Sequence, residues 1–269
     1  MTMLRELEGY YGERGILSTR FTCSHRRQCG AGCAEFTGPK SAFVSTGYER
    51  GDLPRLLFIS LDSGRGDKVD KNRLPSAIRQ HEEIDSEFSK FPKHKHWYRT
   101  HELAWYILRH FNADLKIEDV RRFFAHANSA KCCMNKPQKK KANAILFRNC
   151  KEYLGGELEI LRPDIIVTQG KEAKEAVWSL HKKVINRFDD FASGIAMQSR
   201  NIFWLHTYHP NNWGAFNKQR SFNKETRTAE GWVRYSELIH AFRMNAQQGA
   251  PAVFLPPLRS GKNTAEPGR

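Results

Sequence analysis

Four short apolar runs, separated by long stretches of chain, constrain the fold of this protein more than any other feature. They lie at residues 55–61, 123–128, 164–168 and 201–207. Each run is only a few residues long and ends in polar residues, which is typical of buried parallel strands. Segments with helical character lie between the runs. The alternation therefore predicts an α/β protein, a three-layer α/β/α sandwich around a central four-stranded parallel sheet.

Helical patterns occupy much of the remaining sequence. Apolar residues recur at helical spacing in 100–111, where Thr100 is suited to cap the helix, and in 146–161. The pair Gly155-Gly156 is expected to interrupt the second of these helices. Further helices are expected at residues 1–11, 171–181 and 229–246.

We expect one domain over residues 1–248. Within it, residues 12–50 form an irregular segment that carries cysteines, and residues 68–97 form an insertion over the site or a mobile loop. The proline-containing stretch at 249–269 is expected to be a disordered tail.

Each apolar run ends next to a polar side chain, in the order Asp62, Asn128, Gln169 and His209. Ligands of parallel α/β sheets bind outside the carboxyl ends of the strands. Carboxylate, amide and imidazole groups are therefore expected to converge at one edge of the sheet. This edge is the predicted functional site.

The chain is strongly basic, with a net charge of +15 from 44 Lys and Arg and 29 Asp and Glu. An excess of this size, spread along the whole chain, favours a polyanionic partner, most simply nucleic acid. Solubility alone is the alternative explanation. No apolar stretch is long enough to span a bilayer, and residues 1–9 lack the apolar core of a signal peptide. We therefore expect a cytoplasmic protein with no membrane partner.

Six cysteines fall into two groups, one near the N-terminus and one in the middle of the chain: Cys23, Cys29 and Cys33, then Cys132, Cys133 and Cys150. In a cytoplasmic protein this usage argues against structural disulfides and favours metal binding or catalysis. Four thiolates hold either zinc or a [4Fe–4S] cluster. Zinc sites usually use two tight Cys-x2-Cys pairs, and the long interval from Cys132 to Cys150 does not fit one.

Three motifs in a fixed order point to a known family. Asn128-Ser-Ala-Lys-Cys132 matches Asn-x-x-Lys-Cys, Leu161-Arg-Pro-Asp-Ile-Ile-Val-Thr-Gln-Gly170 matches a buried strand that ends in glycine, and Tyr208-His209-Pro210 matches a His-Pro motif. In this order they resemble the uracil-DNA glycosylase superfamily, and they are most similar to its iron–sulfur branch, often called family 4. The resemblance runs from Cys29 to His209.

The first motif departs from that branch, which usually has Gly-Glu-Gly-Pro-Gly. Here the sequence is Ser60-Leu61-Asp62-Ser63-Gly64, so Leu61 stands in the acidic position and Asp62 falls where other branches keep an aspartate. The N-terminal pair is Cys29-x3-Cys33 instead of Cys-x2-Cys. After Pro210 the chain has Asn211-Asn212-Trp213 instead of Ser.

The resemblance implies a DNA repair glycosylase, an enzyme that hydrolyses the N-glycosidic bond of uracil or a related deaminated base flipped out of DNA. Asp62 would stabilise the cationic sugar and orient the attacking water, with Asp67 in reserve. His209 would bind uracil O2 and stabilise the departing anion. Asn128 would read uracil, because its carboxamide matches O4 and N3–H and mismatches cytosine. Further substrate contacts are expected from Ser63, Gly64 and Trp97, with Tyr98 and Trp213 as other candidates for stacking.

Each of these residues also has a purely structural interpretation. Asp62 suits a loop cap, Asn128 a satisfied strand end and His209 an ordinary loop histidine, while the aromatic residues suit the core. For the metal, the resemblance implies a [4Fe–4S] cluster of structural role, and zinc is the alternative. The expected ligands are Cys29, Cys33, Cys132 and Cys150, with Cys23 and Cys133 as alternates.

Two other functions remain open at this point. The chain can be a relative that binds nucleic acid without catalysis, which Leu61 in the usual acidic position favours, or an N-glycosidase of free nucleotides. The preferred partner is single-stranded or duplex DNA that contains uracil or a damaged base. We expect a monomer.

Overall fold

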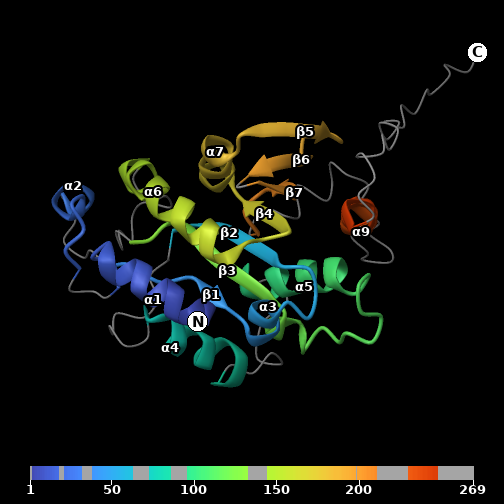
Figure 1. Cartoon of the computed structure of the whole chain (residues 1–269), viewed down its shortest axis with the longest axis horizontal. Helices are drawn as coiled ribbons and strands as arrows, with labels where there is room; N and C mark the ends of the chain where they lie inside the picture. The colour runs from blue at the N-terminus through green and yellow to red at the C-terminus, as the bar shows by residue number, and fades with distance from the viewer. Residues whose placement is uncertain are drawn as a thin grey trace, which may run out of the picture.

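The computed structural model describes residues 2–17, 21–31, 38–62, 73–85, 96–132, 144–197, 199–210 and 230–247. One seven-stranded sheet forms the centre of the protein, with strand order β1-β3-β2-β4-β7-β6-β5 (Figure 1). The strands are β1 (Phe43–Val44), β2 (Leu56–Asp62), β3 (Phe124–Ala130), β4 (Ile165–Gln169), β5 (Lys183–Arg187), β6 (Ala192–Met197) and β7 (Arg200–Thr207).

The four predicted strands are present and form the parallel centre of the sheet. β2 pairs in parallel with β3 on one side and with β4 on the other, and β4 pairs in parallel with β7. The sheet is nevertheless larger than the predicted four strands, because it has seven. Three antiparallel strands, β1, β6 and β5, extend the two edges. The sequence did not reveal them because β1 has only two residues and β5 is only partly buried.

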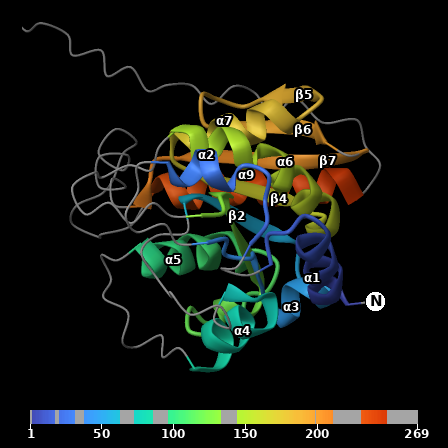
Figure 2. The same ribbon diagram turned by 90° about the vertical axis from the view of Figure 1, so that its left-hand side faces the viewer.

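Helices cover both faces of the sheet and produce the predicted three layers (Figure 2). On one face, α1 (Met3–Glu13), α6 (Ala144–Leu161) and α7 (Lys171–Leu180) pack on residues such as Leu57 and Ile59 of β2. On the other, α5 (His96–Leu108) and α9 (Glu230–Gln247) pack on Leu56 and Phe58. Alternate residues of a strand face opposite sides, so one apolar run supplies both cores.

Shorter helices connect these layers. They are α2 (Arg26–Gly30), α3 (Thr46–Arg50), α4 (Pro75–Gln80), a π-helical turn (His81–Asp85) and a 3₁₀ turn (Val120–Arg122). The predicted insertion therefore contains helical structure between residues 75 and 85. The predicted tail at 249–269 lies outside the described residues, and the division into one domain remains a prediction. Of the helices described, none combines the length and apolar composition that crossing a membrane requires.

Two details of the helix predictions were wrong. Thr100 does not cap α5, which begins four residues earlier; it is buried and donates its hydroxyl to the carbonyl of His96, 3.0 Å away. Gly155 and Gly156 do not interrupt α6. A Cβ on Gly156 would lie 2.3 Å from the Tyr10 ring, so glycine at this position allows α1 to pack closely on α6.

A buried ion pair joins three of these elements. Lys131, directly after β3, contacts the carboxylate of Glu157 on α6, and both side chains are almost completely buried. Tyr11 on α1 donates its hydroxyl to the other carboxylate oxygen of Glu157 and accepts the backbone N–H of Ala42 at 3.0 Å. Both carboxylate oxygens of the glutamate are thus engaged, as a buried charge requires.

Replacement of Glu157 by Gln is expected to destabilise the protein strongly, because it leaves the buried Lys131 ammonium without an opposite charge. The free energy of unfolding, measured by guanidinium titration, should fall by about 3–5 kcal/mol. The same change at the exposed Glu159, two residues further along α6, is the control and should alter it by less than about 0.5 kcal/mol. Similar losses for the two variants would contradict this role of the ion pair.

Candidate functional site

A pocket of about 370 Å³ lies at the carboxyl ends of the central strands. It brings together four residues that the sequence singled out: Asp62, Trp97, Asn128 and His209. These come from β2, α5, β3 and the segment after β7. Further lining residues include Lys40, Ser60, Leu61, Glu82, His96 and His126. The predicted residues Ser63, Gly64, Asp67 and Trp213 lie outside the described residues.

Strand geometry explains why the polar side chains meet here. Ser60 and Asp62 are two residues apart on β2 and share a face, as do His126 and Asn128 on β3. The parallel register sets Ser60 opposite Asn128. Ser129 locks the two strand ends together, because its hydroxyl donates to the carbonyl oxygens of Ser60 and Leu61 at 2.8 and 3.0 Å.

A hydrogen-bonded chain beneath the pocket fixes His126. The Ser60 hydroxyl donates to Gln169 Oε1 at 2.5 Å and lies 2.8 Å from His126 Nε2. Since the Ser60 proton is used on Gln169, His126 donates from Nε2 to the Ser60 oxygen. Gln169 in turn donates to the Thr100 hydroxyl at 3.0 Å. Gln169, expected at the site from its place at a strand end, is fully buried and supports the pocket from below.

Three imidazoles gather in the pocket. The rings of His96 and His209 stack with centroids 5.2 Å apart, and His96 meets His126 edge to face at 6.3 Å. Burial lowers the pKa of His96 to about 4, with a further contribution from His209, and burial also holds the pKa of His126 well below its usual value. Burial lowers the pKa of His209 as well, although the nearby Asp62 carboxylate opposes this shift. All three are therefore neutral at pH 7. The single N–H of neutral His126 is used on Ser60, while those of His96 and His209 can donate without positive charge.

The first turn of α5 also positions the segment that carries His209. His96 stacks on the His209 ring, and the guanidinium of Arg99 donates to the carbonyl oxygen of Pro210. Sequence reasoning missed His96 and His126 as pocket residues. The available signals were the basic-aromatic stretch around His96 and the position of His126 two residues before Asn128 on a strand.

Trp97 forms a wall of the pocket and part of the core. Its ring packs edge to face against His126 at 5.2 Å, Phe124 at 5.8 Å and Phe43 at 6.2 Å. Such contacts fix the indole, so it provides a rigid apolar surface. The neighbouring Tyr98 is not among the residues that line the pocket.

Leu61, which occupies the position where an acidic residue was expected, lies between two sites. It lines the pocket, and it also packs against a small apolar cluster that contains the cysteines. Its side chain fits closely over Gly170, whose φ of 108° favours glycine and where a Cβ would lie 2.9 Å from Leu61 Cδ2. The leucine therefore has a packing role at this position.

Four cysteines of the described residues gather beside the end of β3. Cys29 and Cys132 are buried in the small apolar cluster with Phe21, Leu146 and Phe147, and Cys23 packs against it. Cys150 is buried in the larger core that includes α1 and α6, near enough to Cys132 to affect its pKa. Burial raises the pKa of the Cys132 thiol, and the other three cysteines raise it further. Burial also raises the pKa of Cys150 to about 11. The predicted ligand Cys33 and the alternate Cys133 lie outside the described residues.

Three of the four sulfur atoms already have hydrogen-bond partners. The backbone N–H of Lys131 donates to Cys150 Sγ at 3.4 Å, and the Asn149 amide donates to Cys29 Sγ at 3.3 Å. Cys23 Sγ lies 3.1 Å from the Tyr153 hydroxyl and accepts the N–H of His25 at 3.4 Å. Within the described part of the chain, no three His, Cys, Asp or Glu side chains are arranged to hold a single metal ion.

Comparison with known proteins places this fold and pocket in one family. The model of the uracil DNA glycosylase superfamily matches residues 54–230, about two thirds of the chain. Among curated proteins, none matches. The matched region contains Asp62, Asn128 and His209. It begins at residue 54 and therefore does not include Cys23 and Cys29. The match identifies the superfamily and does not select its iron–sulfur branch.

Proposed function

Because the chain belongs to the uracil-DNA glycosylase superfamily, we propose that it hydrolyses the N-glycosidic bond of uracil, or of a related deaminated base, in DNA. One observation carries this proposal. Asp62, Asn128 and His209, which are 147 residues apart from first to last (209 minus 62), line a single pocket at the carboxyl ends of the parallel strands. Ligands of such sheets bind at this edge.

The size of the pocket supports an extruded base as the ligand. Its volume of about 370 Å³ is at the small end of ligand pockets, which span roughly 300–1,000 Å³. A paired base in a duplex cannot enter a pocket of this size, so the nucleotide has to leave the stack first. The net charge of +15 favours binding of the DNA backbone that carries it.

Asn128 is suited to identify the base. Its side chain is only 6% exposed and is held at the end of a central strand. A carboxamide pairs with uracil by donating to O4 and accepting from N3–H. Cytosine presents the opposite pattern, and it would leave buried polar groups of both partners unpaired, which disfavours it strongly.

Asp62 and His209 are suited to the chemistry. As the glycosidic bond breaks, positive charge develops on the sugar, and a carboxylate beside it stabilises that charge and orients the attacking water. The electron pair of the bond leaves with the base, which becomes an anion. A neutral His209 donates an N–H to O2 of that anion, and its stacking on His96 holds the ring in place.

A [4Fe–4S] cluster bound by the cysteines is a second part of the proposal. The donor set fits, since thiolates are the usual ligands and N–H or O–H donors to sulfur are typical of such sites. Cys29, Cys132 and Cys150 would supply three ligands, and Cys23 or Cys33 the fourth. Such a cluster would supply structural stability by tying the N-terminal segment to the end of β3. A single zinc ion is the alternative.

The presence of Leu61 favours one other function, which is binding of nucleic acid without excision of a base. The acidic side chain expected at this position is missing, and the leucine packs on Gly170. Asp62, one residue further on, supplies a carboxylate to the same pocket. An N-glycosidase of free nucleotides would use the same groups with little affinity for DNA.

Excision of uracil is the direct test of the proposed function. Single-stranded and mismatched duplex oligonucleotides that contain uracil are incubated with the protein and then cleaved at abasic sites with alkali. We expect cleavage by the wild type, and a rate about 10²–10⁴-fold lower for Asp62→Asn and for His209→Ala. Asp52→Asn, which alters a solvent-exposed ion pair with Arg50, is the matched control and should retain the wild-type rate.

The pattern of products also separates the alternatives. If either variant cuts at the wild-type rate, that residue has no part in the reaction. Salt-sensitive DNA binding without an abasic product from any deaminated base would show a binding protein. Product from free nucleotides alone would show a nucleotide N-glycosidase.

Colour tests the cluster. Protein purified without oxygen should be brown, and Cys132→Ala or Cys150→Ala should bleach it and lower its melting temperature, because metal binding contributes to folding. Of Cys23→Ala and Cys33→Ala, only one should bleach the protein, which identifies the fourth ligand. Colourless wild-type protein with stoichiometric zinc by elemental analysis would overturn the cluster.

A further inference from the structure

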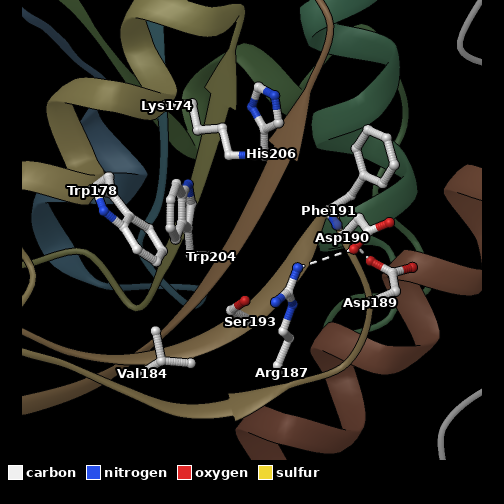
Figure 3. A pocket seen from close by; sticks show the side chains of 10 residues that line it. All are labelled: Lys174, Trp178, Val184, Arg187, Asp189, Asp190, Phe191, Ser193, Trp204 and His206. Atoms are coloured by element: carbon white, nitrogen blue, oxygen red, sulfur yellow. Dashed lines mark hydrogen bonds and ion pairs between the residues drawn. The ribbon is translucent and has the colours of Figure 1, made fainter.

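A second pocket, of about 430 Å³, lies on the sheet face that α7 covers (Figure 3). Lys174 and Trp178 line it from α7, Trp204 and His206 from β7, and Phe191 from the turn between β5 and β6. β5 and β6, two of the three antiparallel strands that the sequence did not reveal, thus build one side of it. Nothing in the proposed reaction uses this pocket.

Aromatic rings provide its walls. Trp178 is 57% exposed, an unusual position for a large indole, and its ring lies 6.1 Å from that of the buried Trp204. Across the pocket, Phe191 and His206 are nearly parallel, with an interplanar angle of 7° and centroids 6.1 Å apart. Flat faces on two sides are suited to a planar ring, because aromatic stacking is favourable in offset and edge arrangements.

The pocket also has a hydrogen-bond donor. The indole N–H of Trp204 donates to Thr168 Oγ1 at 3.0 Å, and that oxygen lies 3.2 Å from His206 Nδ1. Since Thr168 accepts from the indole, we assign its own proton to His206 Nδ1. Burial lowers the pKa of His206 to about 4, so the ring is neutral and its proton is on Nε2. This N–H matches an acceptor on a heterocyclic ring.

Four charged residues line the pocket, and three of them form ion pairs or hydrogen bonds within the protein. Arg187 pairs with Asp190 at 3.0 Å. Asp189 accepts the backbone N–H groups of Phe191 and Ala192 and the hydroxyl of Tyr235. Lys174 is the fourth, and within the described residues no carboxylate forms an ion pair with it. Its ammonium is available to a phosphate.

An aromatic surface connects this pocket with the first. Phe191 packs edge to face on Tyr208, with ring centroids 6.0 Å apart, and Tyr208 is 37% exposed. The next residue is His209 of the first pocket. His206 and His209 are three positions apart, at most about 10 Å along an extended chain. Residues 206–209 thus link the linings of the two pockets.

We infer that the second pocket binds an unpaired nucleotide of the same DNA strand, near the base in the first pocket. The base stacks against Trp178 and Phe191, and the phosphate lies beside Lys174. The inference rests on the proposed function, because it needs a strand that lies across the first pocket. Stacking tolerates every base, so this contact favours single-stranded DNA without selecting a sequence.

Binding to strands of different length tests this inference. Fluorescence anisotropy is measured with labelled single strands that have either one or four nucleotides on each side of uracil, and Asp62→Asn protein is used throughout to keep the strand intact. Trp178→Ala should weaken binding of the longer strand about tenfold. It should leave the shorter strand within twofold, as it has few nucleotides to place in the second pocket. Trp178→Phe, which keeps a ring, should restore most of the affinity.

Two further variants sharpen the result. Lys174→Ala should reduce the slope of log affinity against log salt by about 0.7, the effect of losing one phosphate contact on a single strand. Met244→Ala, an exposed apolar residue on α9, is the control and should bind both strands as the wild type does. Thermal melting shows whether each variant is folded.

Equal affinity of Trp178→Ala and the parent protein for the longer strand would overturn the inference. An equal loss for both strands would overturn it too, since it would place the effect at the first pocket or on the fold. Binding of free dUMP that depends on Trp178, with the longer strand unaffected, would assign the pocket to free nucleotides instead. Excision of uracil by the wild type is measured in a separate assay. A negative result there would contradict the proposed function, whereas the binding results alone decide the role of the second pocket.

Discussion

The buried carboxylate of Glu157, which contacts Lys131 and accepts the Tyr11 hydroxyl, holds together the parts of this protein on which the proposed chemistry depends. Lys131 follows the end of β3, Glu157 lies on α6, and Tyr11 lies on α1. A buried ion pair contributes little net stability compared with apolar residues of the same volume. We infer that the ion pair instead fixes the position of the strand end, because the Lys131 ammonium has one well-defined partner.

That strand end serves two sites at once. Asn128, three residues before Lys131, lines the first pocket, and Cys132, one residue after it, lies in the cysteine cluster. The backbone N–H of Lys131 also donates to Cys150 Sγ. Any shift of this segment would move the Asn128 amide and the cysteines together. The arrangement of the cysteines and the geometry of the pocket are therefore coupled through a few residues of main chain.

The parallel centre of the fold was predictable from sequence, because buried strands of this kind are continuous apolar runs. Asp62, Asn128 and His209 were predictable for a related reason, since each stands just past the end of such a run. β5 and β6 were not, because β5 is only partly buried and Ser193 and Gly194 interrupt the apolar residues of β6. The place of His126 was hidden too, as it depends on Ser60, which lies 66 residues away in sequence and becomes a neighbour only through the register of β2 and β3. The position of Cys23 beside the other cysteines was not predictable either. It depends on how the N-terminal segment folds back onto α6, where Cys23 contacts Tyr153.

The central claim is that the first pocket receives an extruded uracil and reads it through Asn128. A crystal structure of the Asp62→Asn protein with a uracil-containing single strand tests it most directly. We expect the uracil ring in the pocket, with the Asn128 carboxamide within hydrogen-bond distance of O4 and N3, and His209 within hydrogen-bond distance of O2. A strand that crosses the protein with its uracil outside this pocket, or inside it without contact to Asn128, would contradict the claim.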